Sequence, residues 1–376
     1  MANRIPLITI EEHFVSKAVV DYYASQNQEQ AVPEKQGDIM AKLLELGTKR
    51  LKSMDIGRIS IQVISHMPNT LALPLEICTA ANNELYDAIQ NCPDPTRFAA
   101  FAILPTAHPD AATKELKRCV EKLDFVGSMI DNTTNDRYYD DEFFWPIFAA
   151  HEQLDVPVYL HGAPHLLEDS SVFHGNYPSD VSDFLANHGF GWHSEVALHV
   201  LKLFASRLFD KYSHLKMILG RMGEHLPYTL DRQHRLIQKT WPLAARPQRH
   251  LLQVWHENIY VTTSGMFSLA PMACLIHMCC ADKVLYSVDY PFCSNEEGLN
   301  FISGLRESGM INDEDFTSIA HKNAERLLGL RVPDGNSVGL DIDKDNPRLR
   351  SWLSEDSANG EVFPHSPLQT VREQAE

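Results

Sequence analysis

The sequence lacks both a long apolar run and an excess of positive charge. No stretch approaches the roughly 18–20 consecutive apolar residues that a membrane-spanning helix needs. The 376 residues include 33 lysines and arginines against 50 aspartates and glutamates, which gives a formal net charge of −17. Because so acidic a surface repels nucleic acid and anionic lipid, we expect no nucleic-acid partner and no membrane association.

Signals for secretion and for disulfide bonding are also missing. Residues 1–6 pass directly into an apolar run at Leu7, which leaves no room for a signal peptide and predicts a cytoplasmic protein. The seven cysteines include no C-x-x-C pair, so neither a disulfide framework nor a thiolate zinc site is expected. No glycine-rich turn follows the first predicted strand, which disfavours a doubly wound nucleotide-binding sheet.

What the sequence does contain is eight apolar runs that alternate with segments of helical spacing, the pattern of an α/β protein with a (β/α)₈ TIM-type barrel. The predicted strands cover residues 7–10, 59–65, 97–104, 125–130, 156–160, 215–220, 258–264 and 284–288. The predicted helices cover residues 39–55, 73–91, 110–123, 141–154, 195–212 and 271–280, with one more through residues 231–232. Two last helices follow the eighth strand, the second over residues 313–328. We assign the barrel domain to residues 1–335. Residues 336–376 lose periodicity and are predicted to form a C-terminal tail.

Three predicted strands end in residues that bind metals. The first ends in Glu11 and His13, the fifth in His161 and the eighth in Asp289. Residues two apart in a strand share a face, so Glu11 and His13 project to one side and Glu12 to the other. In a barrel the last strand neighbours the first, which brings Asp289 close to both. Carboxylate and imidazole suit a catalytic divalent ion, for which we expect zinc, with manganese or magnesium as alternatives.

Further polar residues follow the sixth strand. Arg221 and Glu224 could form an arginine–carboxylate cluster with Asp289 beside the metal, or a salt bridge of purely structural importance. Arg232, farther along, would suit an anionic substrate or lie on a solvated helix face. Long connections at residues 25–38 and 163–192 are expected near the mouth of the barrel. Four histidines lie in or directly after the second connection, and we expect them to be solvated: His165, His174, His188 and His193.

With these residues in place, the chain resembles the metal-dependent aromatic acid decarboxylases of the amidohydrolase superfamily. That group includes the 2,3-dihydroxybenzoate, γ-resorcylate, 5-carboxyvanillate and salicylate decarboxylases. The resemblance extends from about residue 7 to residue 330. It rests on six segments: Glu11-Glu12-His13-Phe14, Tyr159-Leu160-His161, residues 218–227, Thr262-Thr263-Ser264-Gly265, residues 287–292 and Asn323-Ala324-Glu325-Arg326-Leu327.

The resemblance implies non-oxidative decarboxylation of an ortho-hydroxylated aromatic acid of the hydroxybenzoate or orsellinate type. It implies one divalent ion that binds the substrate's carboxylate and ortho hydroxyl, and a homodimer or homotetramer. Asp289 would protonate the ring carbon, Arg232 would lie near the substrate and Phe292 would be an aromatic wall. The implied metal ligands are Glu11, His13, His161 and Asp289.

One position departs from this family. Where the relatives have a histidine in a catalytic relay with the glutamate, this chain has Arg221, and a guanidinium cannot pass protons near neutral pH. His225, which follows Glu224, is not assigned as a substitute. Two alternatives therefore stay open. One is metal-dependent hydrolysis or non-decarboxylative carbon–carbon cleavage of a phenolic or polyketide compound, with Arg221 stabilising an oxyanion. The other is a catalytically silent binding barrel.

Overall fold

The computed structural model describes residues 4–27, 38–69, 71–163, 171–279, 281–333 and 338–341. Residues Arg4–Leu340 form one compact unit, and of the second unit, residues 1–3 and 341–376, only Asp341 is described. Most of the predicted loop at 25–38, His165 and nearly all of the predicted tail therefore lie outside the described residues. No helix in the described part is long and apolar enough to cross a membrane.

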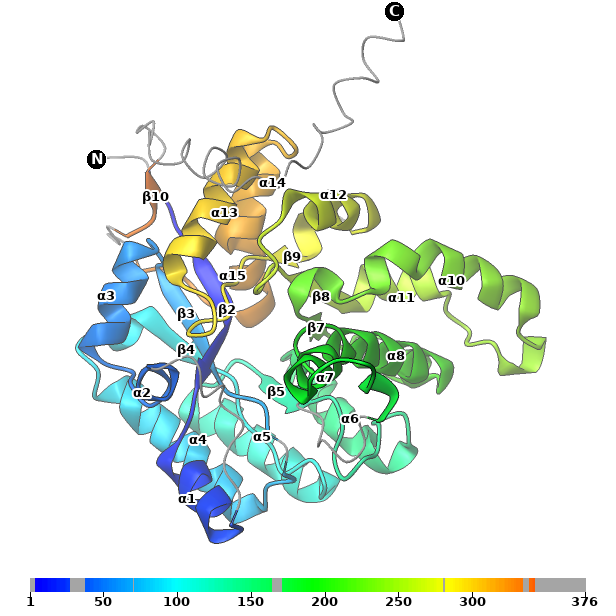
Figure 1. Cartoon of the computed structure of the whole chain (residues 1–376), viewed down its shortest axis with the longest axis horizontal. Helices are drawn as coiled ribbons and strands as arrows, with labels where there is room; N and C mark the ends of the chain where they lie inside the picture. Colours follow the sequence, from blue (N-terminus) through cyan, green and yellow to red (C-terminus); the bar gives the residue numbers. More distant parts are fainter. Residues whose placement is uncertain are drawn as a thin grey trace, which may run out of the picture. The chain divides into compact units, whose positions relative to one another are not determined.

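Eight parallel strands build the barrel, and each lies within or next to a run predicted from the sequence (Figure 1). They pair side by side in two sheets, of three and of five strands. In chain order the strands are β2 (Ile8–Phe14), β3 (Ile61–His66), β4 (Phe98–Ala100), β5 (Ser128–Asp131), β6 (Val158–His161), β7 (Met217–Leu219), β8 (Ile259–Thr262) and β9 (Val284–Leu285). Two further short strands are β1 (Arg4–Ile5) and β10 (Leu340–Asp341).

Backbone hydrogen bonds join the two sheets at both edges. Ala102, just beyond β4, pairs in parallel with Ser128 of β5. At the other edge, the Asp289 amide donates to the Glu11 carbonyl over 3.0 Å, and the His13 amide donates to the Tyr290 carbonyl over 2.7 Å. The last strand therefore lies beside the first, as a (β/α)₈ barrel requires, and the predicted fold is confirmed.

Helices follow the strands around the outside, while α10 and α11 extend to one side of the barrel (Figure 1). Most were predicted, but α1, α7 and α11 were not. The helices are α1 (Lys17–Ser25), α2 (Ile39–Leu43), α3 (Thr48–Ile56), α4 (Leu75–Gln90), α5 (Pro109–Leu123), α6 (Trp145–Leu154), α7 (Ser179–Ala186), α8 (Gly191–Ala205), α9 (Leu208–Lys211), α10 (Leu226–Thr240), α11 (Leu251–Asn258), α12 (Leu269–Met278), α13 (Asn295–Glu307), α14 (Asp313–Thr317) and α15 (Asn323–Leu328).

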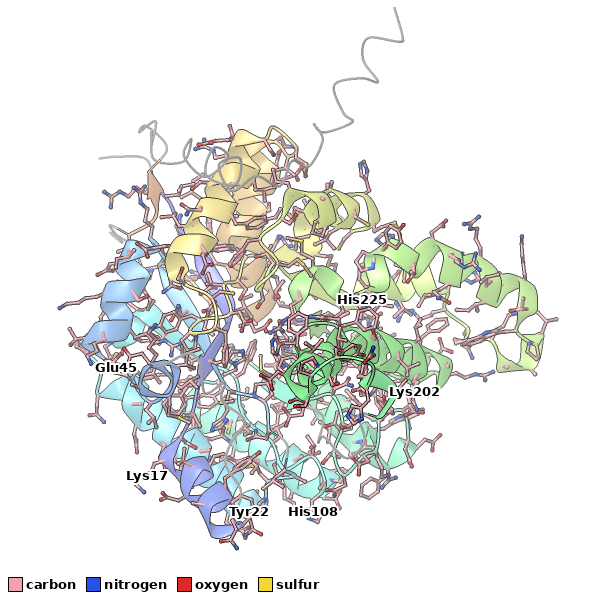
Figure 2. All side chains as sticks on the ribbon, in the orientation of Figure 1. Lys17, Tyr22, Glu45, His108, Lys202 and His225 are labelled. Carbon is pink, nitrogen blue, oxygen red and sulfur yellow. The ribbon has the colours of Figure 1, made fainter. Side chains whose placement is uncertain are left out.

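The single helix predicted over residues 39–55 is wrong in its middle, where the chain breaks between α2 and α3. The Glu45 carboxylate, labelled in Figure 2, accepts the amides of Gly47 and Arg50, each over 2.9 Å. This side chain therefore satisfies free N–H groups at the start of α3 and adds negative charge where the helix dipole favours it. The apolar spacing continued through the break and concealed it.

Glu12 stabilises the junction between β2 and the chain after β9. It is fully buried and points away from Glu11 and His13, as predicted. Its two carboxylate oxygens accept the amides of Val288 and Tyr290, each over 3.0 Å. Burial raises the pKa of Glu12 to about 8, although these two amides and the Arg50 charge oppose the shift. The side chain thus connects the two ends of the barrel sequence.

We predict that Glu12→Ala lowers the free energy of unfolding by about 3 kcal/mol, because two buried amides lose their acceptor. Urea denaturation followed by circular dichroism measures this. Glu121→Ala is the matched control: Glu121 is an exposed glutamate that pairs with Lys117, and its loss should cost less than about 0.5 kcal/mol. Equal stability losses in the two variants would contradict the role given to Glu12.

Candidate metal centre

The strand ends converge as the sequence predicted. Glu11, His13 and His161 each offer one ligand atom, and these atoms all lie within 4.8 Å of one another. All three residues are buried, with exposures of 0%, 1% and 2%. Their elements β2 and β6 end at the same rim of the barrel, so the parallel topology alone brings residues 150 positions apart into contact.

Hydrogen bonds fix which nitrogen of His161 faces the centre. Nδ1 lies 2.5 Å from the Gly162 carbonyl, which can only accept, so Nδ1 carries the proton. The Nε2 lone pair then lies 2.9 Å from Glu11 Oε1. Two acceptors that face each other at this distance attract a cation. A backbone carbonyl that orients the imidazole in this way is typical of metal-binding histidines.

His13 and Asp289 meet in a similar way. Asp289 Oδ1 lies 3.1 Å from His13 Nε2, yet this buried oxygen receives no hydrogen bond from any residue that the structure describes. Burial lowers the pKa of His13 although the neighbouring Asp289 raises it, so the imidazole is neutral near pH 7. A neutral imidazole and an oxygen without a donor are suited to a shared cation. The donor set of two imidazoles and two carboxylates therefore fits a divalent metal ion.

Neighbouring residues hold the two carboxylates in place. The Tyr159 hydroxyl donates to Glu11 Oε2 and lies 3.1 Å from Thr262 Oγ1. Gly265, at φ +61°, lies so close to Asp289 that an added Cβ would be 3.2 Å from Oδ2. Burial raises the pKa of Glu11, but the charge of Arg221 and the contacts with imidazole outweigh it and hold that pKa well below its usual range. Glu11 is therefore ionised.

Arg221 lies inside the ligand set. Its Nη1 lies 2.8 Å from Glu11 Oε1 and its Nη2 lies 2.9 Å from Asp289 Oδ2. Of the two carboxylates predicted to cluster with Arg221, Asp289 is an ion-pair partner, whereas the place of Glu224 is taken by Glu11. The guanidinium belongs to a turn of four successive positive φ angles, from 46° at Arg221 to 59° at Glu224. Such angles are costly for non-glycine residues, and they occur here where side chains must be aimed.

Glu224 pairs with a histidine that was predicted from the sequence to be solvated. Its Oε2 accepts a hydrogen bond from Nδ1 of His193, which lies near the start of α8 and is only 9% exposed. The Nε2 of His193 lies 3.1 Å from the His188 carbonyl. Burial lowers the pKa of His193, but the hydrogen bond and charge of Glu224 outweigh it and raise that pKa above its ordinary value. Sequence spacing carried no signal for this pair, because it depends on how α8 packs.

Aromatic rings flank the cluster. The ring of Phe292 lies 5.6 Å from that of His13, and the ring of Trp192 lies 5.9 Å from that of His161. Trp192 was not singled out from the sequence; it packs on Gly162, where an added Cβ would be 2.7 Å from the tryptophan Cβ. Arg232 is exposed on α10, so the structure does not bring it into the buried cluster. His225, labelled in Figure 2, precedes the same helix and lies 3.2 Å from Ser194 Oγ.

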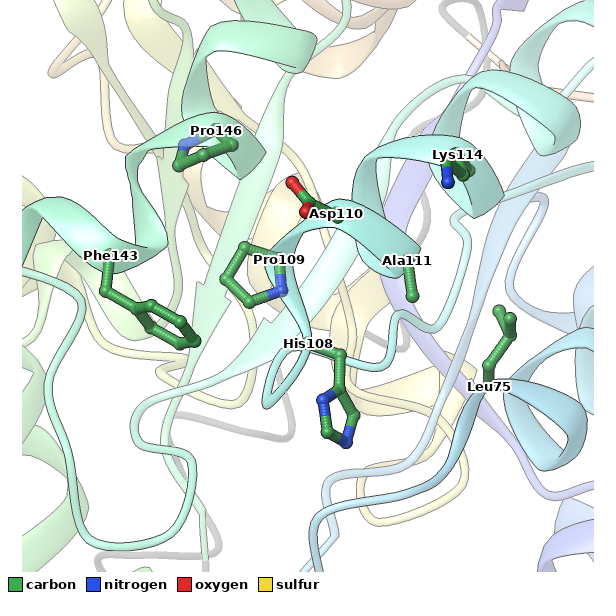
Figure 3. A pocket seen from close by; sticks show the side chains of 8 residues that line it. All are labelled: Leu75, His108, Pro109, Asp110, Ala111, Lys114, Phe143 and Pro146. Atoms are coloured by element: carbon green, nitrogen blue, oxygen red, sulfur yellow. The ribbon is translucent and has the colours of Figure 1, made fainter.

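A separate cavity of about 590 Å³ lies between the starts of α4, α5 and α6 (Figure 3). It contains none of the predicted site residues and offers no comparable set of metal ligands. Its lining residues are Leu75, His108, Pro109, Asp110, Ala111, Lys114, Phe143 and Pro146. We therefore place the candidate site at the strand ends rather than in this cavity.

Known proteins resemble this chain over most of its length. A family model described as amidohydrolase matches residues 49–330. Decarboxylase orsB of Emericella nidulans is 42% identical over 329 residues, which cover 87% of this chain and 98% of that protein. The crystal structure of a 2,6-dihydroxybenzoate decarboxylase with 2,6-dihydroxybenzoate matches with a TM-score of 0.75 and 33% identity, over 86% of this chain and 99% of that one. A dihydroxybenzoic acid decarboxylase from Polaromonas sp. JS666, with bound manganese and 2-nitroresorcinol, matches with a TM-score of 0.74 and 31% identity. This match covers 86% of this chain and 97% of that one.

The ligand set predicts that His13→Ala loses bound metal, because one of two imidazoles is removed. Metal analysis after gel filtration should give close to one divalent ion per wild-type chain and less than about half of that in the variant. His256→Ala, which changes an exposed histidine on α11, should leave the metal content unchanged. Equal metal content in all three proteins would remove His13 from the ligand set.

Proposed function

This chain belongs to the amidohydrolase family, and from that membership we propose that it is a metal-dependent carboxy-lyase that decarboxylates hydroxylated aromatic acids without an oxidant. The observation that carries the proposal is the buried cluster at the strand ends, where two imidazoles and two carboxylates meet. The relatives named decarboxylase support the reaction class.

The substrate class follows from charge and shape. Rings of Trp192 and Phe292 lie on either side of the ligand set, against His161 and His13 respectively, and suit a flat aromatic molecule between them. The guanidinium of Arg221 supplies a fixed positive charge for a carboxylate. We propose an ortho-hydroxylated benzoate, of the dihydroxybenzoate or orsellinate type. Arg232, exposed on α10, remains a proposed outer contact for such an anion.

The reaction replaces a carbon–carbon bond by a carbon–hydrogen bond. A ring carbon accepts a proton, the bond to the carboxylate breaks, its electron pair returns to the ring and CO₂ leaves. A divalent ion, when bound, would supply positive charge for the substrate's carboxylate and ortho hydroxyl. Zinc is our expectation from the sequence, and manganese is present in the Polaromonas relative. Asp289 is the proposed proton donor to the ring, and its Oδ2 is held by Arg221 Nη2.

Asp289 must regain its proton by another route than the relay histidine of the relatives, because Arg221 stands at that position and keeps its protons at any physiological pH. His193 donates a hydrogen bond to Glu224, and Glu224 Oε1 lies on the same side of Gly220 as Glu11 Oε2. We propose that this pair stores a proton beside the site and restores it to the acidic groups there after each turnover.

The decisive test incubates metal-loaded protein with 2,6-dihydroxybenzoate, 2,3-dihydroxybenzoate, salicylate and orsellinate, and follows CO₂ and products. In D₂O the product should carry deuterium at the former carboxyl position. We expect Asp289→Asn to lower kcat by about 10³-fold, because the proposed acid is removed. His256→Ala should retain wild-type turnover.

Other outcomes would favour the alternatives. Products that keep the carboxyl group would indicate hydrolysis or another carbon–carbon cleavage, for which Arg221 in the relay position is the motivating observation. Bound metal without turnover of any acid or ester would indicate a silent barrel. We further propose a cytoplasmic homo-oligomer, and light scattering that gives a single chain of 42.6 kDa would contradict the oligomer.

The pH dependence of kcat should follow the protonation of His193. This imidazole carries its extra proton below its raised pKa and loses it above, so kcat should fall as the pH rises through a value above 6.5. His193→Asn keeps a side-chain amide that can donate to Glu224. In this variant we expect the alkaline limb, the fall of kcat at high pH, to vanish and kcat to be about tenfold lower. The ion pair's stabilisation should likewise be complete below pH 6.5 and be lost as the pH rises through the raised pKa. An unchanged alkaline limb in the variant would exclude His193 as the proton store.

A further inference from the structure

Arg221 contacts three of the four candidate metal ligands at once. Its Nη1 lies 2.8 Å from Glu11 Oε1 and 3.1 Å from His161 Nε2, and its Nη2 lies 2.9 Å from Asp289 Oδ2. The guanidinium is 11% exposed. Burial lowers the pKa of Arg221, but the charges of Glu11 and Asp289 outweigh it and raise that pKa above its ordinary value. A permanent cation therefore occupies the centre of this ligand set.

These contacts use electron pairs that a metal would also need. An imidazole nitrogen without a proton has one lone pair. His161 donates through Nδ1 to the Gly162 carbonyl, so Nε2 is its only available ligand atom, and Arg221 Nη1 lies within hydrogen-bond distance of that nitrogen. The Nε2 lone pair cannot serve the guanidinium and a metal ion together. Metal binding to His161 thus requires Arg221 to move from Nε2.

Charge opposes joint occupancy as well. Glu11 and Asp289 contribute two negative charges and Arg221 one positive charge, which leaves minus one at the cluster when both histidines are neutral. A divalent ion changes that sum to plus one, and it would lie next to a guanidinium in a buried site where like charges repel strongly. The Trp192 ring, 5.8 Å from Arg221 Cζ, provides a neighbouring surface on which a displaced guanidinium can rest.

We propose that Arg221 is an internal competitor for the metal: it stabilises the ligand set when no ion is bound, and the ion must displace it from His161 and Glu11. The protein therefore binds its metal more weakly than the same barrel without this arginine, and its metal-free form is correspondingly more stable. The displaced guanidinium becomes available to an anion in a site that is then net positive. Metal affinity and metal-free stability are thus linked through one side chain.

The test measures metal affinity rather than catalysis. Protein stripped with a chelator is titrated with Zn²⁺ and with Mn²⁺ against a chromophoric chelator, and melting temperatures are recorded with and without metal. For Arg221→Met we expect a metal dissociation constant at least about tenfold lower than in wild type, the scale of ordinary coupling between two sites. The metal-free Tm should fall, and the metal-induced rise in Tm should grow. Arg235→Met on α10, which removes an exposed arginine paired with Asp231, should change neither quantity.

Two outcomes would overturn the proposal. One is an unchanged or higher metal dissociation constant in Arg221→Met. The other is a metal-free Tm equal to that of wild type. If metal-free Arg221→Met does not fold, Arg221→Lys decides instead, because lysine keeps one charge but cannot span the ligands with a planar fork. Its dissociation constant should lie below the wild-type value, and an equal or higher value would contradict the competition. Neither result depends on the substrate, so failure here is distinguishable from failure of the decarboxylase assignment.

Discussion

Buried negative charge at one end of the barrel is the constraint on which the rest of the site depends. Glu11 and Asp289 lie on adjoining strand ends with exposures of 0% and 5%, and two carboxylates left unpaired there would strongly destabilise the fold. The surrounding groups supply positive charge and hydrogen-bond donors to these carboxylates. Arg221 donates to both carboxylates, and the Tyr159 hydroxyl and the imidazoles complete their surroundings. The same demand makes the site suitable for a divalent ion.

The backbone at Arg221 shows how strongly these ion pairs constrain the chain. Arg221, Met222, Gly223 and Glu224 all have positive φ, and each of the three non-glycine residues costs on the order of 1–3 kcal/mol in that region. The ion pairs of Arg221, the buried Met222 side chain and the bond from Glu224 to His193 hold the turn in place. One short turn therefore delivers a cation to the ligand set and a carboxylate to a separate proton-holding pair.

The sequence allowed the barrel and the convergence of the candidate metal ligands to be predicted because both depend on local patterns. An apolar strand that ends in glutamate, histidine or aspartate can be recognised from a few residues. Because the strands of the barrel are parallel, these ends then meet at the same rim. The partner of Glu224 could not be found in this way, since His193 reaches it only through the packing of α8. The break before α3 was missed because the start of α3 depends on the Glu45 side chain, which accepts amides there, and not on the apolar spacing.

The junction between β2 and the chain after β9 has a consequence for how the protein is made. Glu12 and Tyr290 are bonded although 278 positions separate them, and Glu11 receives the Asp289 amide at the same junction. The first strand therefore leaves the ribosome long before its neighbour exists. A nascent chain that ends before residue 288 lacks the Asp289 carboxylate and both amides that donate to Glu12, those of Val288 and Tyr290. The set of four candidate ligands is thus complete only once residue 289 of the 376 has been added to the chain.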